Sequence, residues 1–178
     1  MSLYTCDISS PLGTLKAGAT DDGVCLLCFS DMPLYDVLKK RVHDATGESF
    51  GPGKSRILEQ LEAQLAAYFS GASATLDVPL HLIGTSFQQQ VWKAVRAISS
   101  GSTISYGALS KQLGSTQAVR AVAKANGDNP VLLLVPCHRV VGADGSLTGY
   151  SGGLLRKQWL LEHEQRLAGT AVPRLFPA

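Results

Sequence analysis

The stretch "GSTISYGALSKQLGSTQAVRAVAKANG", residues 101–127, indicates the fold of the second half of the chain more clearly than any other segment. Ser105 is placed to cap a short helix, because a serine oxygen there can accept a hydrogen bond from a free amide of the first turn. Gly114 then permits a tight turn, and Ser115 or Thr116 can cap a second helix that runs to the end of the stretch. Two short helices joined by a glycine turn predict a helix-turn-helix motif.

The second of these helices carries a polar stripe among small residues. Gln117, Arg120 and Lys124 recur at i, i+3 and i+7 and therefore share one face. Ala118 and Ala121 would allow the helix backbone to approach a grooved partner closely. Two interpretations stay open for this segment: a solvated face of a small domain, or a DNA-reading helix whose basic side chains meet phosphates or enter a groove.

The remainder of the chain divides at about residues 79–85. Short strands separated by turns are predicted within residues 3–29. Thr85 and Gln88 form a capping-box pattern that opens a helix beyond the division. Helices outside the helix-turn-helix segment are predicted from apolar periodicity near residues 34–42, 54–70, 86–98 and 154–167. Together these patterns predict an α+β protein.

The composition is that of a globular protein with little charge bias. Of 178 residues, 45% are hydrophobic and 17% charged, and the formal net charge of +2 permits an anionic partner without requiring one. The first ten residues show no basic stretch followed by an apolar core, and apolar runs such as Val131–Val135 are too short to span a bilayer. We therefore expect no membrane association and a cytoplasmic location, where thiols stay reduced.

Two of the four cysteines are expected in the core. Cys25 and Cys28 form a CxxC pattern, which is typical of metal or redox sites. They lie in an apolar stretch that reads as a strand, where residues i and i+3 point to opposite faces, so the two sulfurs would not converge. We interpret both as small packed hydrophobes and expect no metal; a zinc site from Cys6, Cys25, Cys28 and His81 is the alternative.

Cys137, within "VPCHRVVG", has a different setting. The apolar run Val131–Val135 predicts a strand that ends at a proline, which places the cysteine at a strand end. Three interpretations compete: a buried core cysteine, a metal ligand, and an activated nucleophile. Positive charge on His138 and Arg139 would favour the thiolate, which is the nucleophilic form, so the third interpretation is favoured.

One geometric condition applies to this cysteine and its histidine. In an extended chain neighbouring side chains point to opposite sides, so His138 can act on Cys137 only if the chain turns or a water bridges them. A histidine base usually has a third group that orients its ring. Glu162 and Glu164 in the last predicted helix are both candidates, and residue chemistry alone leaves the choice open.

Four motifs follow one another along the second half of the chain: "TISYGAL" (103–109), "AVRAVAKANGDNP" (118–130), "PCHRV" (136–140) and "GYSGGLLRKQWLLEHE" (149–164). In this order they resemble the O6-alkylguanine-DNA alkyltransferases, also called methylated-DNA–protein-cysteine methyltransferases. The resemblance covers about residues 84–167 and is weaker before them.

The resemblance implies direct repair of alkylated DNA without a cofactor. The Cys137 thiolate would attack the alkyl carbon on O6 of guanine, with O4 of thymine as a further candidate, and keep the group as a thioether. Reduction or an ordinary hydrolytic water does not open that bond, so the protein would react once and be consumed. The sequence shows no phosphate-binding loop or dinucleotide fingerprint, as expected for such a reaction.

The resemblance also implies roles for individual residues. His138 would act as the base on Cys137 through a water, with Glu164 holding its imidazole. Tyr106 would supply the proton that guanine gains as it leaves. Ser151 and the backbone near Val140 and Tyr150 would hydrogen-bond the guanine edge. Asn129 would bridge the helix-turn-helix to the active-site strand.

Double-stranded DNA is the implied partner, bound by a monomer through the minor groove. The target nucleotide must leave the base stack to react, and Arg120 would fill the space it leaves in the duplex. The small residues of the second helix suit the narrow minor groove. The remaining expected DNA contacts come from Gln117, Ala118, Ala121 and Lys124.

The implied architecture has two domains and a tail. Residues 1–80 would form a ribonuclease-H-like α/β domain, residues 84–167 a helical, winged-helix-like domain, and residues 168–178 a tail. Two rival functions remain. A helix-turn-helix DNA-binding regulator or damage sensor without transfer would not need Cys137. A cysteine–histidine hydrolase or acyltransferase would turn over.

Overall fold

The computed structural model describes residues 2–53 and 55–169. Contacts divide the chain into two compact units, which we describe separately. The first unit runs to Thr85 and includes Pro130–Leu134, and the second comprises Ser86–Asn129 and the residues from Val135 onward. Most of the predicted tail lies outside the described residues. Among the helices that the structure does describe, none has the length and apolar character needed to cross a bilayer.

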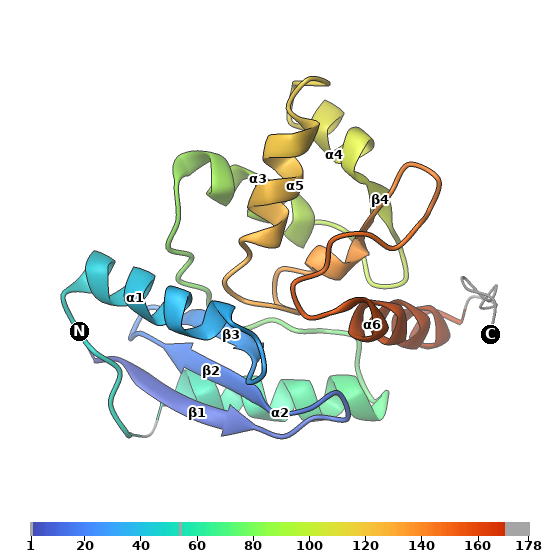
Figure 1. The fold of residues 1–178 in the computed structure, drawn as a ribbon. Coiled ribbons are helices and arrows are strands. Elements are labelled where there is room, and N and C mark those ends of the chain that lie inside the picture. The colour runs from blue at the N-terminus through green and yellow to red at the C-terminus, as the bar shows by residue number, and fades with distance from the viewer. Residues whose placement is uncertain (1, 54, 170–178) are drawn as a thin grey trace. The chain divides into compact units, whose positions relative to one another are not determined.

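The first unit contains a three-stranded antiparallel sheet between two helices. The strands β1 (Tyr4–Ile8), β2 (Leu15–Ala19) and β3 (Val24–Phe29) are ordered β1-β2-β3. Helix α1 (Leu34–Thr46) packs on β3, and α2 (Arg56–Ser70) lies on the other side of the sheet against β1 and β2 (Figure 1). Every residue of β3 is buried because both faces of that strand are covered. The predicted strands and both predicted helices are confirmed.

The two cysteines of β3 are core residues, as expected. Cys25 and Cys28 are both buried, and burial raises the pKa of Cys25 to about 12 and that of Cys28 to about 11. His81 Nδ1 lies 2.9 Å from the Thr20 hydroxyl oxygen. Within residues 2–53 and 55–169, no three His, Cys, Asp or Glu side chains gather in a way that could hold a metal ion.

The predicted strand over residues 131–135 is wrong. This part of the chain pairs with β3 only briefly, because the amide of Leu27 donates to Pro130 O and the Leu27 carbonyl accepts from the amide of Leu132. Leu133 then adopts a left-handed backbone with φ of 71°, which turns the chain away. The run is apolar because all five of its residues are buried, and composition alone cannot distinguish such a segment from a strand.

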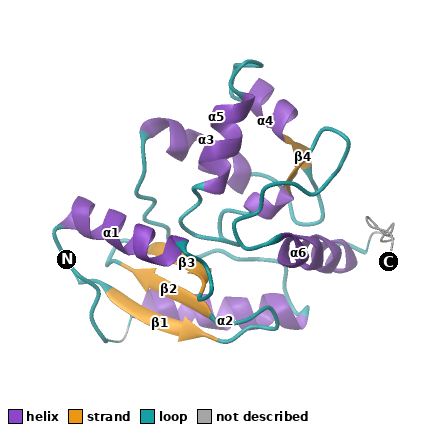
Figure 2. Cartoon of the chain, viewed as in Figure 1, coloured by secondary structure: helices purple, strands orange, loops and turns teal. Residues whose placement is uncertain are grey.

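The second unit is mainly helical (Figure 2). The elements are α3 (Ser86–Arg96), β4 (Ile104–Ser105), α4 (Tyr106–Gln112), α5 (Val119–Gly127), the 3₁₀ helix η1 (Cys137–Arg139), β5 (Val140–Val141) and α6 (Leu154–Leu167). The strands β4 and β5 form a short parallel pair. The Trp92 indole donates to Ala125 O at 2.8 Å, which fixes α3 against α5.

The two helices expected in residues 101–127 are confirmed as α4 and α5, but their caps differ. Ser105 caps α4 as predicted, since its hydroxyl oxygen accepts from the amide of Ala108 at 3.0 Å. The predicted cap of the second helix by Ser115 or Thr116 is wrong, because α5 begins later, after Ala118, and has no side-chain cap. The Ser115 carbonyl instead accepts from the Ser110 hydroxyl, so this residue belongs to the turn.

Loss of the α4 cap should destabilise the protein measurably. Ser105→Ala removes the only acceptor that the structure shows for the Ala108 amide, so we expect the free energy of unfolding to fall by about 1 kcal/mol. Denaturant unfolding measures the change. Thr116→Ala is the matched control and should change stability by less than about 0.5 kcal/mol. Equal losses in the two variants would contradict the assignment of the cap.

Candidate active site

Cys137 lies at the start of η1, immediately after Pro136. The chain is therefore turned, not extended, at this cysteine, which satisfies the geometric condition for cooperation with His138. Cys137 is buried, with 2% of its surface exposed. The turn places a thiol and an imidazole from consecutive residues in the same buried region of the second unit.

The environment of Cys137 keeps its thiol protonated at rest. Burial raises the pKa of Cys137 to about 11, although a hydrogen bond from Asn129 and the positive charge of Lys157 act in the lowering direction. The expectation that His138 and Arg139 favour the thiolate is wrong for the resting protein. Both side chains are bound to Glu164 instead, whose negative charge offsets theirs.

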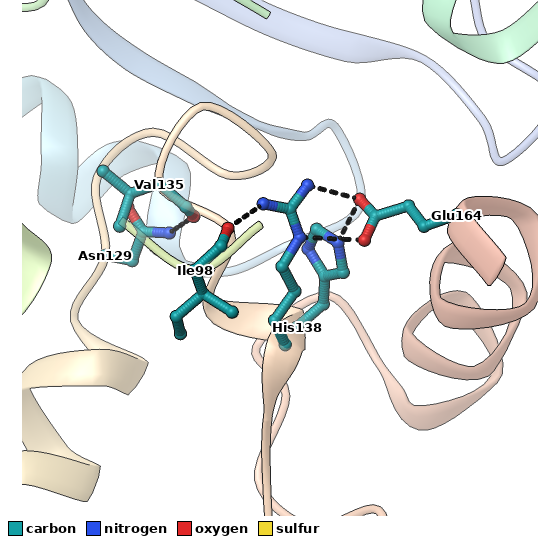
Figure 3. A network of polar contacts seen from close by, with 6 residues as sticks. Ile98, Asn129, Val135, His138 and Glu164 are labelled. Carbon is teal, nitrogen blue, oxygen red and sulfur yellow. Dashed lines mark hydrogen bonds and ion pairs between the residues drawn. The ribbon is translucent and has the colours of Figure 1, made fainter. Parts of the chain in front are cut away.

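A buried network built on Glu164 holds the residues after the cysteine (Figure 3). One carboxylate oxygen, Oε1, lies 2.8 Å from His138 Nε2 and accepts from Arg139 Nη2 at 2.8 Å. The other, Oε2, accepts from Arg139 Nε at 2.8 Å. Arg139 Nη1 donates to Ile98 O at 2.5 Å, which connects the network to the segment after α3. The structure thus brings Glu164 to His138, whereas Glu162 accepts from Gln158 on the surface of the same helix.

The network determines which imidazole nitrogen is available. Burial by itself raises the pKa of Glu164, but the charge and hydrogen bond of His138 and those of Arg139 outweigh it, and the pKa ends well below its usual range. An ionised carboxylate only accepts hydrogen bonds, so His138 Nε2 carries the hydrogen. His138 Nδ1 is buried and has no hydrogen-bond partner among the described residues. Its lone pair can therefore accept a proton.

Two tyrosines lie close to this cysteine. The Tyr106 hydroxyl donates to Thr148 O at 3.1 Å, and burial together with the charge of Cys137 raises the pKa of Tyr106, so the phenol stays protonated. The Tyr150 ring meets the His138 ring edge to face, with centroids 6.4 Å apart. The Tyr150 hydroxyl is buried and lacks a hydrogen-bond partner within the described residues. A protonated phenol beside a thiol can act as a general acid.

Two asparagines connect α5 to the cysteine segment. Asn129 Nδ2 donates to Val135 O at 2.7 Å, which holds the chain just before η1 (Figure 3). Asn126 Nδ2 lies 3.4 Å from Cys137 O and is buried in α5. Ser151, exposed in the loop before α6, donates its hydroxyl hydrogen to Gly127 O at 2.8 Å, so only its lone pairs remain for a ligand.

The predicted DNA-binding residues lie on the exposed side of α5 and its N-terminus. Lys124 is mostly exposed, but its ammonium pairs with Asp128 one turn later at 2.8 Å. This pairing reduces the charge that Lys124 offers to a partner. Gln117, Arg120 and Ala121 are also exposed, and Ala118 is half-buried.

Comparison with known proteins agrees with this arrangement. Residues 86–166 match the family described as "6-O-methylguanine DNA methyltransferase, DNA binding domain". A methylated-DNA–protein-cysteine methyltransferase of Mycolicibacterium paratuberculosis is 53% identical over 159 residues, which cover 89% of this chain and 90% of that protein. The chain belongs to the methylated-DNA–protein-cysteine methyltransferase family.

Other members of this methyltransferase family match to different extents. A Mycobacterium bovis member is 55% identical over 105 residues, but the match spans 59% of this chain and only 64% of that protein. The crystal structure of Mycobacterium tuberculosis OGT in complex with DNA has a TM-score of 0.77 and 40% identity, and covers 94% of both chains. The mixed α/β fold of this chain is therefore that of solved members of the methyltransferase family.

The sequence patterns do not reveal the buried ammonium of Lys157 or the role of Glu164 as an acceptor for Arg139. Lys157 is completely buried in α6. A signal was available, because Lys157 precedes Leu160, Leu161 and Glu164 by three, four and seven positions and so shares their helix face. A lysine at an apolar-face position indicates a buried ammonium that needs fixed acceptors.

Proposed function

We propose that this protein repairs DNA directly by moving an alkyl group, typically methyl, from O6 of guanine to Cys137 Sγ. The observation that supports this best is the single buried turn that holds Cys137 beside His138, with Glu164 on the far nitrogen of the imidazole. An imidazole base held by a carboxylate can deprotonate a thiol that is otherwise protonated at neutral pH. Family membership supplies the substrate class, which geometry alone does not select.

The reaction can be written so that bonds and protons balance. The Cys137 proton passes through one water to His138 Nδ1, and the imidazolium is stabilised by ionised Glu164. Sulfur attacks the alkyl carbon, a carbon–sulfur bond forms and the carbon–O6 bond breaks. Tyr106 gives its proton to the leaving guanine and regains one from His138 or solvent. The sum is one thiol proton lost and one guanine proton gained.

The same proposal assigns the guanine contacts and the mode of DNA binding. The backbone at Val140 and Tyr150 and the lone pairs of Ser151 would receive the flipped base, and Asn129 would hold the cysteine segment in place. The α5 surface would enter the minor groove with Arg120 in the vacated space. Most contacts would then be to the DNA backbone, with little sequence preference.

Several finer assignments are part of the proposal. The first domain, residues 1–80, would be ribonuclease-H-like and the second, residues 84–167, winged-helix-like, with residues 168–178 as a tail. The three-stranded sheet with two helices and the α4–α5 pair beside a short strand pair support these assignments. We propose a monomer that needs no cofactor and acts in the cytoplasm, and the free thiols of all four cysteines are compatible with that compartment.

Intact mass after reaction tests the proposed function. The full chain is incubated with a duplex that carries one O6-methylguanine, and its mass is then measured. The expected result is a gain of one methyl group per protein, located on the Cys137 peptide and reaching a stoichiometric end point. Turnover beyond one equivalent would indicate a hydrolase, and unchanged mass with DNA binding retained would indicate a regulator or sensor.

Arg120→Ala should weaken transfer on duplex DNA more than it weakens DNA binding. The arginine is exposed on α5, and its proposed role is to occupy the space of the flipped base, which costs a few kcal/mol to extrude. We expect the single-turnover transfer rate at saturating protein to fall by roughly tenfold or more. A tenfold fall corresponds to a loss of about 1.4 kcal/mol in the stabilisation of the flipped base. Lys39→Ala in α1 removes the same charge from the other unit and should leave the rate unchanged.

A further inference from the structure

Asn126 is a buried side chain that the proposed mechanism does not use. It lies in the last turn of α5 with 2% of its surface exposed. Its amide oxygen, Oδ1, is buried and has no hydrogen-bond partner among the described residues. Leaving a buried acceptor unpaired is costly, and buried polar groups nearly always have a partner. The unpaired oxygen therefore points to a donor that this part of the chain does not itself supply.

The orientation of the Asn126 amide follows from its nitrogen. Nδ2 lies 3.4 Å from the carbonyl oxygen of Cys137. A carbonyl can only accept a hydrogen bond, so the nitrogen and not the oxygen of the amide faces Cys137. Oδ1 is therefore turned away from that carbonyl. The amide is fixed beside the residue that would accept the alkyl group, with its acceptor unused.

The same amide reaches the proposed proton donor. Tyr106 gives its hydroxyl hydrogen to Thr148 O at 3.1 Å, so the lone pairs of the hydroxyl oxygen can accept. Burial is the largest cause that raises the pKa of Tyr106, and a hydrogen bond from the Asn126 side chain acts in the lowering direction. Asn126 thus contacts both the cysteine segment and the phenol that would protonate the leaving guanine.

The chemistry of the proposed substrate supplies a donor at this point. In an O6-alkylguanine the ring nitrogens N1 and N3 are both unprotonated, and both are bonded to C2, which carries the exocyclic amino group. Whichever ring nitrogen takes the proton from Tyr106, the amino group is its neighbour. A side chain that contacts Tyr106 can therefore reach an amino N–H. O4-alkylthymine and O6-alkylhypoxanthine have no amino group at this carbon.

We propose that Asn126 is a specificity-determining residue, whose buried Oδ1 accepts a hydrogen bond from the exocyclic amino group of the flipped guanine. The contacts of Nδ2 with Cys137 O and Tyr106 hold the oxygen in that orientation. A site built to bind a substrate N–H discriminates against an analogue that lacks it, because its own acceptor then stays buried and unpaired. The inference rests on the proposed function, since it assumes alkyl transfer from a flipped guanine.

Two substrates test the assignment. Single-turnover methyl transfer to Cys137 is measured at saturating protein with a duplex that carries O6-methylguanine and with one that carries O6-methylhypoxanthine, which lacks the amino group. We expect wild type to react at least about tenfold faster with O6-methylguanine. Asn126→Leu removes the amide at similar volume. Its ratio of the two rates should be about tenfold lower than that of wild type, the order expected for loss of one hydrogen bond to a neutral group.

Two further variants are the matched controls. Asn126→Asp keeps an oxygen acceptor in place of Oδ1, so it should retain more of the preference for O6-methylguanine than Asn126→Leu, whatever its absolute rate. Asn129→Leu removes the neighbouring buried asparagine, which holds Val135 O, and should slow both substrates by the same factor. A merely structural role of Asn126 would also slow both substrates equally and leave the ratio unchanged.

Three results would overturn the inference and leave the proposed function intact. They are equal rates of wild type on the two duplexes, an unchanged ratio in folded Asn126→Leu, and a loss of preference in Asn126→Asp as large as in Asn126→Leu. Transfer from neither duplex would overturn the proposed function and this inference with it. Cooperative thermal unfolding checks the fold of each variant. Should Asn126→Leu not fold, the smaller Asn126→Ala also removes the amide and carries the test.

Discussion

Cys137→Ser is expected to lower methyl transfer from an O6-methylguanine duplex by a factor on the order of 10³ or more, with DNA affinity changed by less than about twofold. A serine hydroxyl fits the same buried position, so the turn at η1 should persist. An alcohol is far harder to deprotonate than a thiol and is a weaker nucleophile at an alkyl carbon. The variant thus separates chemistry from binding.

Transfer is followed by intact mass and DNA affinity by titration with the same duplex. Cys28→Ser in β3 is the matched control, because Cys28 is a buried thiol of the first unit with a pKa raised to about 11. It should transfer at the wild-type rate. A methyl group found on another cysteine of the Cys137→Ser protein would contradict the assignment of the acceptor.

Glu164→Gln is expected to reduce both stability and transfer. The carboxylate is completely buried and holds the Arg139 guanidinium and the His138 ring at once. Its removal leaves the Arg139 charge without its counter-charge, which should cost about 3–5 kcal/mol of unfolding free energy. Transfer should fall by roughly 10²-fold, because His138 loses the group that orients its ring and stabilises its protonated form.

The stability loss should depend on pH in a defined direction. The pKa of Glu164 is lower in the folded than in the unfolded state, so its stabilisation is present above its unfolded pKa, near 4.3, and is lost as pH falls through the folded value. Denaturant unfolding should therefore show a difference between wild type and Glu164→Gln that is full at pH 7 and shrinks in strong acid. Glu162→Gln, whose carboxylate meets only Gln158 among the contacts described, should stay within about 0.5 kcal/mol of wild type.

The helices were predictable from the sequence because their signals are local. Apolar residues at helical spacing identify α2, and its end at Gly71 fits a left-handed glycine with φ of 82°. The Ser105 cap follows from the same kind of short-range rule. The Val131–Val135 run shows the limit of such rules, because its apolar character reflects burial and carries no information about the turn at Leu133.

The candidate reactive residues could also be named from the sequence. The adjacency of Cys137, His138 and Arg139 after a proline indicated a candidate nucleophile, and the family resemblance selected Glu164 where residue chemistry had left Glu162 open. The sequence could not reveal the protonation state of the thiol. Charge beside Cys137 in the chain pointed to a thiolate, whereas the folded environment raises its pKa to about 11.

The sequence by itself thus determined the helices, the core cysteines of β3 and the chemical groups available at Cys137. Only the tertiary structure decided what those groups do to one another. Glu164 lies 26 positions after His138 and Lys157 lies 17 positions after Val140, yet each pair is in hydrogen-bond contact. Periodicity reports which face of an element is buried, but a pKa depends on the charges and dipoles that surround a group in space, and folding brings those from distant parts of the chain.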